Sequence, residues 1–348
     1  MKRTFSVVGS AKQLSARQSQ YVELKNALNA LGLEESKTLE SDLVVFVNYN
    51  RKLLRKVKNH DSKLVLIRLE PRAVLPIQYK KRIEKKFDLV VSPGRQIEEG
   101  SNVKFIEWPY KFDTNPSAPS NESVDLKSVI EKVISEGYFE YKNWKLRKHK
   151  MVIVAANKVS PTSHSNYRLR RKLATSLPKS DLEVYGALWN SKKITTFIYR
   201  TRVMIYSLRS GYLPNLKEIY GDFFLKCGNY VNEPRNKHEV LKDFCFSLVI
   251  ENTSDYCTEK IFDAMINGTI PIYIGPKNYA INLPKNVFIW CSGSLDELQS
   301  IFDNVTESEC IVMLKSIKDF LQSDAFLLNW SHKNVYQRTA LHIKQEMQ

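Results

Sequence analysis

The feature that most constrains the fold is the stretch 246–275, where two apolar runs flank a polar loop and a helical pattern. The first run, 246–250, is apolar except for one serine and has the length of a strand buried on both faces. A helical pattern begins near Glu259 and stops at Gly268, and the second apolar run, 270–274, follows directly. This order predicts a parallel βαβ unit.

Polar side chains gather where the first of these strands ends and the helix begins. Thr258 is placed to cap the helix, whose free N–H groups and partial positive charge suit an anionic group such as a phosphate. Lys260 adds a full positive charge at the same place. The ordinary alternative is a solvated pair, Glu259 and Lys260, in the first turn of a surface helix.

The same stretch resembles the donor-binding motif of the α1,3-fucosyltransferases, glycosyltransferase family 10. That motif is Phe-Glu-Asn, a spacer, Tyr-x-Thr-Glu-Lys, and then Gly-Thr-x-Pro. Here Glu251–Asn252, Tyr256–Lys260 and Gly268–Pro271 match it, with isoleucine in place of the phenylalanine. The resemblance implies a GT-B fold, in which two Rossmann-like α/β domains face each other across a cleft. It also implies inverting transfer of L-fucose from GDP-L-fucose.

The resemblance suggests a role for each polar residue of the motif. Lys260 would contact the diphosphate, and Glu259 would accept hydrogen bonds from sugar or ribose hydroxyls. Asn252 and Tyr256 would orient the nucleotide. Glu251, at the strand end, could stabilise positive charge that develops on the sugar ring.

A second basic group lies in the predicted helix 166–177. Family members carry an arginine at the start of this helix, and counting back from Leu177 places Arg170 on it, with Arg168 and Arg171 as neighbouring candidates. A guanidinium binds two phosphate oxygens at once, so Arg170 or Arg168 would clamp the diphosphate. A basic solvated helix face is the alternative.

The predicted general base is Glu70, which directly follows the apolar run 64–69. An inverting transfer needs a carboxylate that takes the acceptor hydroxyl proton. Family members have a glutamate at the corresponding strand end, followed by a Phe-Asp-x-Val landmark that 87–90 supplies. A surface glutamate before a proline turn is the alternative.

Strands alternate with helical patterns along the whole chain, which predicts parallel sheets covered on both faces. After a charged, aperiodic stretch, a new apolar run begins at Met151. We therefore predict an N-terminal acceptor-binding domain over 1–145 and a nucleotide-sugar donor domain over 146–325. A C-terminal helix over 326–348 could cross back to the first domain. The strands expected in the first half are 5–8, 43–47, 64–69, 87–91 and 103–106.

Composition indicates which type of family member this chain resembles and where in the cell it is located. The 348-residue chain has no apolar run long enough for a membrane span, and its five cysteines show no paired or zinc-like spacing. Animal members of the family have a membrane anchor and disulfides, so a bacterial, cytoplasmic type is expected here.

The net charge is +16, and 51–95 holds 14 Lys or Arg against 4 Asp or Glu. That excess could meet an anionic membrane on its inner face, meet an anionic acceptor, or simply be solvated.

The sequence lacks the signatures of other chemistries. It has no Asp-x-Asp triplet, no phosphate-binding glycine loop and no His-Glu-x-x-His. We therefore expect no bound metal and no tightly held cofactor, although a divalent metal could stimulate transfer. The expected acceptor is an oligosaccharide or lipid-linked glycan of a bacterial surface glycan such as lipopolysaccharide. Three alternatives stay open: another nucleotide sugar as donor, a basic nucleic-acid-binding module, and a catalytically inactive glycan-binding relative.

Overall fold

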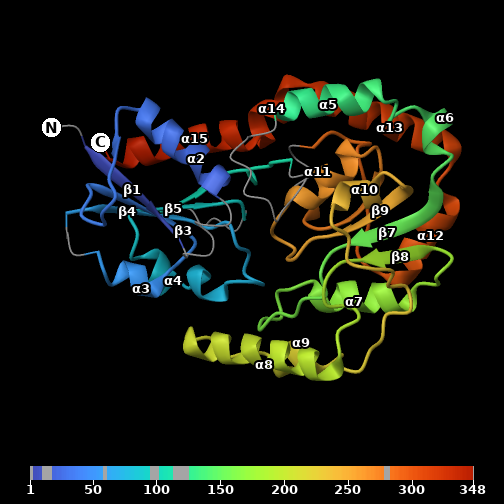
Figure 1. Ribbon diagram of the computed structural model, residues 1–348, viewed down its shortest axis with the longest axis horizontal. Coiled ribbons are helices and arrows are strands. Elements are labelled where there is room, and N and C mark those ends of the chain that lie inside the picture. Colours follow the sequence, from blue (N-terminus) through green and yellow to red (C-terminus); the bar gives the residue numbers. More distant parts are fainter. Residues whose placement is uncertain are drawn as a thin grey trace. The chain divides into compact units, whose positions relative to one another are not determined.

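The computed structural model describes residues 3–9, 18–57, 61–94, 102–112, 125–277 and 283–347. These residues form two compact units, each built around one parallel sheet (Figure 1). The first unit consists mainly of Met1–Lys111 and Leu327–Gln348, and the second mainly of Asp125–Phe326.

The first unit contains a six-stranded sheet in the order β2-β1-β3-β4-β5-β6. All neighbouring strands are parallel. The strands are β1 (Thr4–Val8), β2 (Glu34–Glu35), β3 (Leu43–Val47), β4 (Lys63–Ile67), β5 (Leu89–Ser92) and β6 (Val103–Phe105). The helices are α2 (Gln18–Ala30), α3 (Arg51–Leu54), the 3₁₀ turn η1 (Pro76–Tyr79), α4 (Lys81–Glu84) and α15 (His332–Met347).

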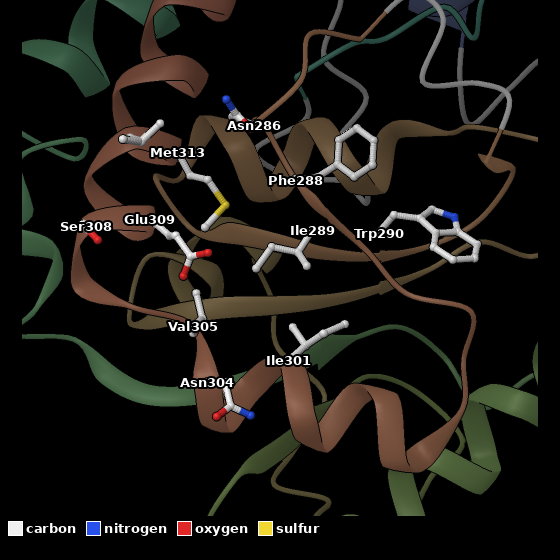
Figure 2. A pocket seen from close by; sticks show the side chains of 11 residues that line it. Asn286, Phe288, Ile289, Trp290, Ile301, Asn304, Val305, Ser308, Glu309 and Met313 are labelled. Atoms are coloured by element: carbon white, nitrogen blue, oxygen red, sulfur yellow. The ribbon is translucent and has the colours of Figure 1, made fainter.

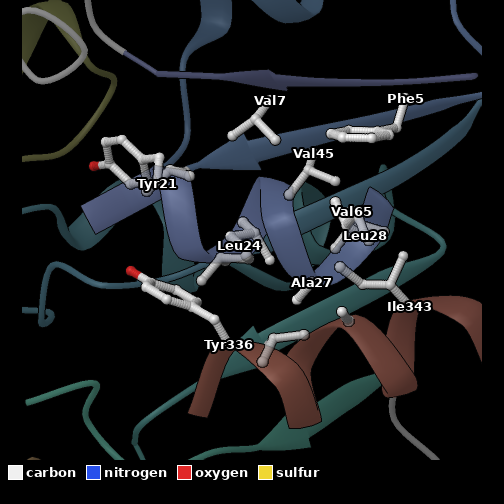
Figure 3. Packing of buried hydrophobic residues seen from close by; sticks show 14 of the residues in the cluster. Phe5, Val7, Tyr21, Leu24, Ala27, Leu28, Val45, Val65, Tyr336 and Ile343 are labelled. Carbon is white, nitrogen blue, oxygen red and sulfur yellow. The ribbon is translucent and has the colours of Figure 1, made fainter. Parts of the chain in front are cut away.

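The C-terminal helix α15 completes the core of the first unit. It lies along α2, and the two helices together cover one face of the sheet (Figure 1). Figure 3 shows Leu24 and Leu28 of α2 between the strand residue Val45 and the residues Tyr336 and Ile343 of α15. Residues more than 300 positions apart in the sequence therefore share one apolar core.

The second unit contains a five-stranded parallel sheet in the order β11-β10-β9-β7-β8. Its strands are β7 (Lys148–Val154), β8 (Leu182–Tyr185), β9 (Phe244–Ile250), β10 (Ile270–Ile274) and β11 (Ile289–Trp290). Its main helices are α5 (Leu126–Ser135), α6 (Tyr141–Trp144), α7 (Tyr167–Ser176), α8 (Lys193–Arg209), α9 (Leu216–Tyr220), α10 (Lys237–Leu241), α11 (Glu259–Ile266), α12 (Leu295–Asn304) and α13 (Glu307–Gln322). The short α14 (Asp324–Trp330) carries the chain from this unit to α15.

The predicted α/β class with two parallel sheets is confirmed, and each strand expected in the first half is present as β1, β3, β4, β5 or β6. The division between the units falls earlier than the predicted boundary near 145. Helices α5 and α6 lie in the second unit because both pack against α13. Within the described ranges, no helix combines the length and apolar character that crossing a bilayer requires.

The packing of α15 predicts a position-specific loss of stability. Ile343 is fully buried, so Ile343→Ala should lower the free energy of unfolding of the first unit by about 2–5 kcal/mol. Leu341, on the same helix, is 50% exposed, and Leu341→Ala should change it by no more than about 0.5 kcal/mol. Urea unfolding of both variants checks this. Equal midpoints would show that α15 does not contribute to the core.

Candidate active site

The predicted donor site forms where the chain leaves β9 and enters α11. All 7 residues of β9 are buried, since β7 and β10 pair with it on either side. The N–H of Glu251 donates to the carbonyl of Ile274 at 2.9 Å, which extends the ladder by one residue. The polar loop therefore starts from the fixed end of a central strand, at the edge where parallel sheets bind ligands.

Glu251 organises this loop from inside. Its side chain is fully buried, and its two carboxylate oxygens accept from the N–H and the hydroxyl of Thr258, both at 2.7 Å. The Nζ of Lys260 donates to the same carboxylate at 3.2 Å. These contacts engage both carboxylate oxygens inside the fold, which gives Glu251 a positioning role in the loop. That it also stabilises positive charge on a sugar ring stays a prediction.

Lys260 is the cation that Glu251 positions. Its Nζ also donates to the Thr258 hydroxyl at 2.7 Å, and its side chain is 18% exposed. Burial opposes the charged form of this amine, but the carboxylates of Glu251 and Glu259 outweigh it, so the pKa of Lys260 is raised. An ammonium has three N–H donors, and these two bonds leave one for a ligand. The site therefore holds a fixed cation at the start of α11.

Arg170 approaches the same loop from α7. Its guanidinium donates to the carbonyl of Ile250 at 2.8 Å and to Oδ1 of Asn252 at 3.0 Å. The side chain is buried, and this burial lowers the pKa of Arg170. These two contacts hold the end of β9 and orient Asn252. Arg168, two residues earlier on the helix, is exposed.

Arg170 and Lys260 line one small cavity, with a volume of about 30 Å³. Two residues that were not predicted from the sequence, Lys237 and Asp263, also line it. Lys237 Nζ lies 2.5 Å from the carboxylate of Asp263, which is buried on α11. An aspartate on the apolar face of a helix needs a buried partner. The position of Asp263 among apolar residues was therefore the signal in the sequence that could have revealed this pair.

The other motif residues differ in their access to ligand. Thr258 stands at the N-cap position of α11, but its side chain makes no cap bond because it is engaged with Glu251. Tyr256 is fully buried, which argues against the predicted contact with a nucleotide. Asn252 is partly exposed, and the side chain of Glu259 is 36% exposed. Together with Lys260, these two present polar groups at the surface of the loop.

Glu70 lies in the first unit, in the loop after β4. Its N–H donates to Oδ1 of Asn48 at 2.8 Å, and its carbonyl accepts from Gln78 at 2.6 Å and from the Tyr79 hydroxyl at 2.9 Å. Asn48 has a positive φ of 61° at the end of β3, and its side chain caps the loop. The backbone of Glu70 is thus fixed at the carboxyl edge of its sheet, and its side chain is partly exposed.

A larger cavity in the second unit lies elsewhere. It has a volume of about 620 Å³ and is bordered by β11, α12 and α13 (Figure 2). Ile289, Trp290 and Met313 line it, and none of its lining residues belongs to the donor motif. Glu309, at its wall, is engaged in capping α13 through Thr306. In the part of the chain that the structure describes, no cluster of His, Cys, Asp and Glu has the makings of a metal site.

Comparison with known proteins identifies the segment that carries this site. Residues 145–309 match the family model described as glycosyltransferase family 10 (fucosyltransferase) C-term. This segment is similar to glycosyltransferase family 10. The matched residues include β9, the loop from Glu251 to Thr258, and α11.

Curated relatives match shorter segments. The chain is 38% identical over 74 residues to 4-galactosyl-N-acetylglucosaminide 3-alpha-L-fucosyltransferase 9 of Cricetulus griseus, a match that covers 20% of each protein. It is 29% identical over 108 residues to alpha-(1,3)-fucosyltransferase C of Drosophila melanogaster, which covers 29% of this chain and 25% of that protein. These matches thus span a quarter or less of the relatives' own lengths.

Solved structures resemble the whole chain in fold. Anabaena Alr3699/HepE in complex with UDP-glucose aligns with a TM-score of 0.55 at 11% identity, covering 99% of this chain and 100% of that one. An alpha-glucosyltransferase (AGT) in complex with UDP aligns with a TM-score of 0.53 at 10% identity, with the same coverage. The fold is therefore the GT-B fold of two Rossmann-like units.

The contacts of Glu251 predict that it and Glu259 contribute differently to stability. Glu251→Gln places an NH₂ group against the Thr258 hydroxyl and the Lys260 ammonium and removes a buried charge partner. It should destabilise the second unit by about 3–5 kcal/mol. Glu259→Gln is the matched control, because its carboxylate is part-exposed and 4.0 Å from Lys260, and should cost about 1 kcal/mol or less. Equal stability of the two variants, measured by denaturant unfolding, would contradict the positioning role.

Proposed function

We propose that this protein transfers L-fucose from GDP-L-fucose to a hydroxyl of an oligosaccharide acceptor, with inversion at the anomeric carbon. The observation that carries the proposal is the family match over 145–309, which contains a buried carboxylate and a lysine fixed at the start of a helix. The curated relatives that match parts of this chain are fucosyltransferases by name.

In this proposal the second unit binds the donor. Lys260 contacts the diphosphate, since it offers a fixed positive charge and a remaining N–H donor beside the N-terminus of α11. Asn252, held by Arg170, and the part-exposed Glu259 bind hydroxyl or base edges of the nucleotide sugar. Arg170 adds charge beneath the diphosphate without direct contact. As the bond between the anomeric carbon and the β-phosphate oxygen breaks, these positive groups stabilise the leaving GDP.

The first unit supplies the acceptor side. We propose Glu70 as the general base that removes the acceptor hydroxyl proton while the oxygen attacks the sugar. Asn48, Gln78 and Tyr79 hold its backbone by hydrogen bonds, so the side chain is attached at a fixed point on the edge of the sheet. The acceptor would be a glycan of a bacterial surface polymer, free or lipid-linked, at the cytoplasmic face. No bound metal is needed in this scheme, because lysine and the helix terminus stabilise the leaving group.

The donor proposal makes a direct prediction about nucleotide binding. GDP at a hundred times its Kd should raise the free energy of unfolding by about 2.7 kcal/mol, because it binds only the folded protein. UDP at the same concentration should give a clearly smaller shift in thermal unfolding. A shift with UDP and none with GDP would exclude the fucosyl donor and leave another nucleotide sugar. If neither GDP nor UDP shifts thermal unfolding and the protein binds DNA with an affinity that falls as salt rises, the nucleic-acid alternative is favoured.

The base proposal is tested by Glu70→Gln. This change keeps the shape of the side chain and removes the proton acceptor, so the transfer rate should fall about 10²–10⁴-fold while GDP affinity stays unchanged. The acidic limb of the rate–pH profile should disappear as well. Glu40→Gln, at an exposed position in the same unit, is the control and should leave the rate unaltered. A Glu70→Gln rate above roughly a third of wild type would mean that another group takes the proton.

A further inference from the structure

Helix α8 is attached to the second unit in an unusual way. Of its 17 residues only Arg200 and Ser207 are buried, and both are polar. Arg200 donates to the carbonyl of Ile219 at 2.7 Å and to Asp222 at 2.9 Å, and Ser207 donates to the carbonyl of Tyr212 at 2.9 Å. The helix is therefore held by hydrogen bonds and an ion pair on its inner side.

The apolar side chains of α8 lie on the outer side instead. Ile194, Phe197, Ile198, Ile205 and Leu208 recur at the i, i+3, i+4 and i+7 spacing of one helix face. Each is at least 39% exposed, and Ile194 reaches 62%. A surface helix ordinarily turns this stripe toward the core, so its exposure marks a surface made for another partner.

Aromatic side chains extend this stripe beyond the helix. The Phe197 ring lies 6.3 Å from that of Phe223, which lies 5.1 Å from that of Phe224. Phe224 is 78% exposed, and Lys193 Nζ lies 5.6 Å from the centroid of its ring. The apolar face therefore runs from α8 onto the segment that follows α9, with a lysine at its rim. We call this the α8 face.

The charged side chains of α8 itself have one sign. The helix contains four Lys or Arg and no Asp or Glu, and all of these cations except Arg200 are exposed. Arg202 and Arg209 follow Ile198 and Ile205 by four residues each, so they flank the apolar stripe, and both are exposed. An exposed apolar stripe bordered by cations is the pattern of a helix that lies in the surface of an anionic bilayer.

We propose that the α8 face docks on an anionic membrane surface, with the apolar stripe in the headgroup region and the arginines on lipid phosphates. Charge complementarity favours this occupant over a second copy of the chain, whose α8 face would carry the same positive charge. The basic segment 51–95 is a weaker candidate. Its exposed cations, such as Arg82 and Lys85, surround apolar residues Ile83 and Phe87 that are buried, so it offers charge without apolar insertion.

Co-sedimentation with lipid vesicles tests the proposal. The wild-type protein should bind vesicles of phosphatidylglycerol and phosphatidylcholine, and bind far less to phosphatidylcholine alone. Phe197→Ser combined with Ile205→Ser should weaken this partitioning at least about 10-fold, since two exposed apolar side chains are lost with no change in charge. Arg202→Glu combined with Arg209→Glu should weaken it by more than about 10-fold on anionic vesicles.

Matched controls separate the α8 face from other surfaces. Ile311→Ser combined with Val312→Ser removes two apolar residues that are 44% and 50% exposed on α13 and should leave binding unchanged. Arg82→Glu combined with Lys85→Glu tests the 51–95 segment. This variant should still bind anionic vesicles, because the apolar stripe of the α8 face is unchanged. Failure of the wild type to bind, or equal binding by the Phe197/Ile205 variant, overturns the proposal. A third result would also overturn it: the wild type forms dimers and does not bind vesicles, and the Phe197/Ile205 variant is monomeric. The α8 face would then bind a second copy of the chain.

Discussion

The carboxylate of Glu251 is the group on which the candidate donor site depends. It stands fully buried at the end of a central strand and joins three donors, from the Thr258 N–H and hydroxyl and the Lys260 ammonium. A buried carboxylate is costly unless it is paired and hydrogen-bonded, so this network is a requirement of the fold as well as of the site. It fixes where α11 begins and where its lysine points. A second cation, the guanidinium of Arg170, ties the same strand end to α7.

The sequence predicted this region well because the relevant constraints are local. Continuous apolar runs predict buried parallel strands, and β9 and β10 lie where those runs lie. The two ends of the helix can be placed from Thr258 and Gly268 alone. What could not be predicted is the direction of each side chain. Glu251 and Tyr256 turn inward, while Glu259 stays part-exposed, and only packing decides that difference.

Arg170 and Arg168 illustrate the same limit. Both are basic residues in one helix, and the spacing alone left them as neighbouring candidates. On α7, Tyr167, Arg170 and Ala174 share the buried face, whereas Arg168 lies outside it. The predicted boundary near 145 differs from the division between the compact units for a related reason. An amphipathic helix such as α5 shows which of its faces is buried but not which sheet or helix it will pack against.

The most direct test of the central claim is calorimetric binding of GDP and GMP to the wild type and to Lys260→Ala. If the Glu251-fixed ammonium contacts the second phosphate, the substitution should weaken GDP binding about 10–100-fold, the size of a lost charge-assisted hydrogen bond, and change GMP binding much less. Lys172→Ala, an exposed charge on α7, should alter neither. Equal weakening of GDP and GMP by Lys260→Ala, or no weakening of either, would contradict the account.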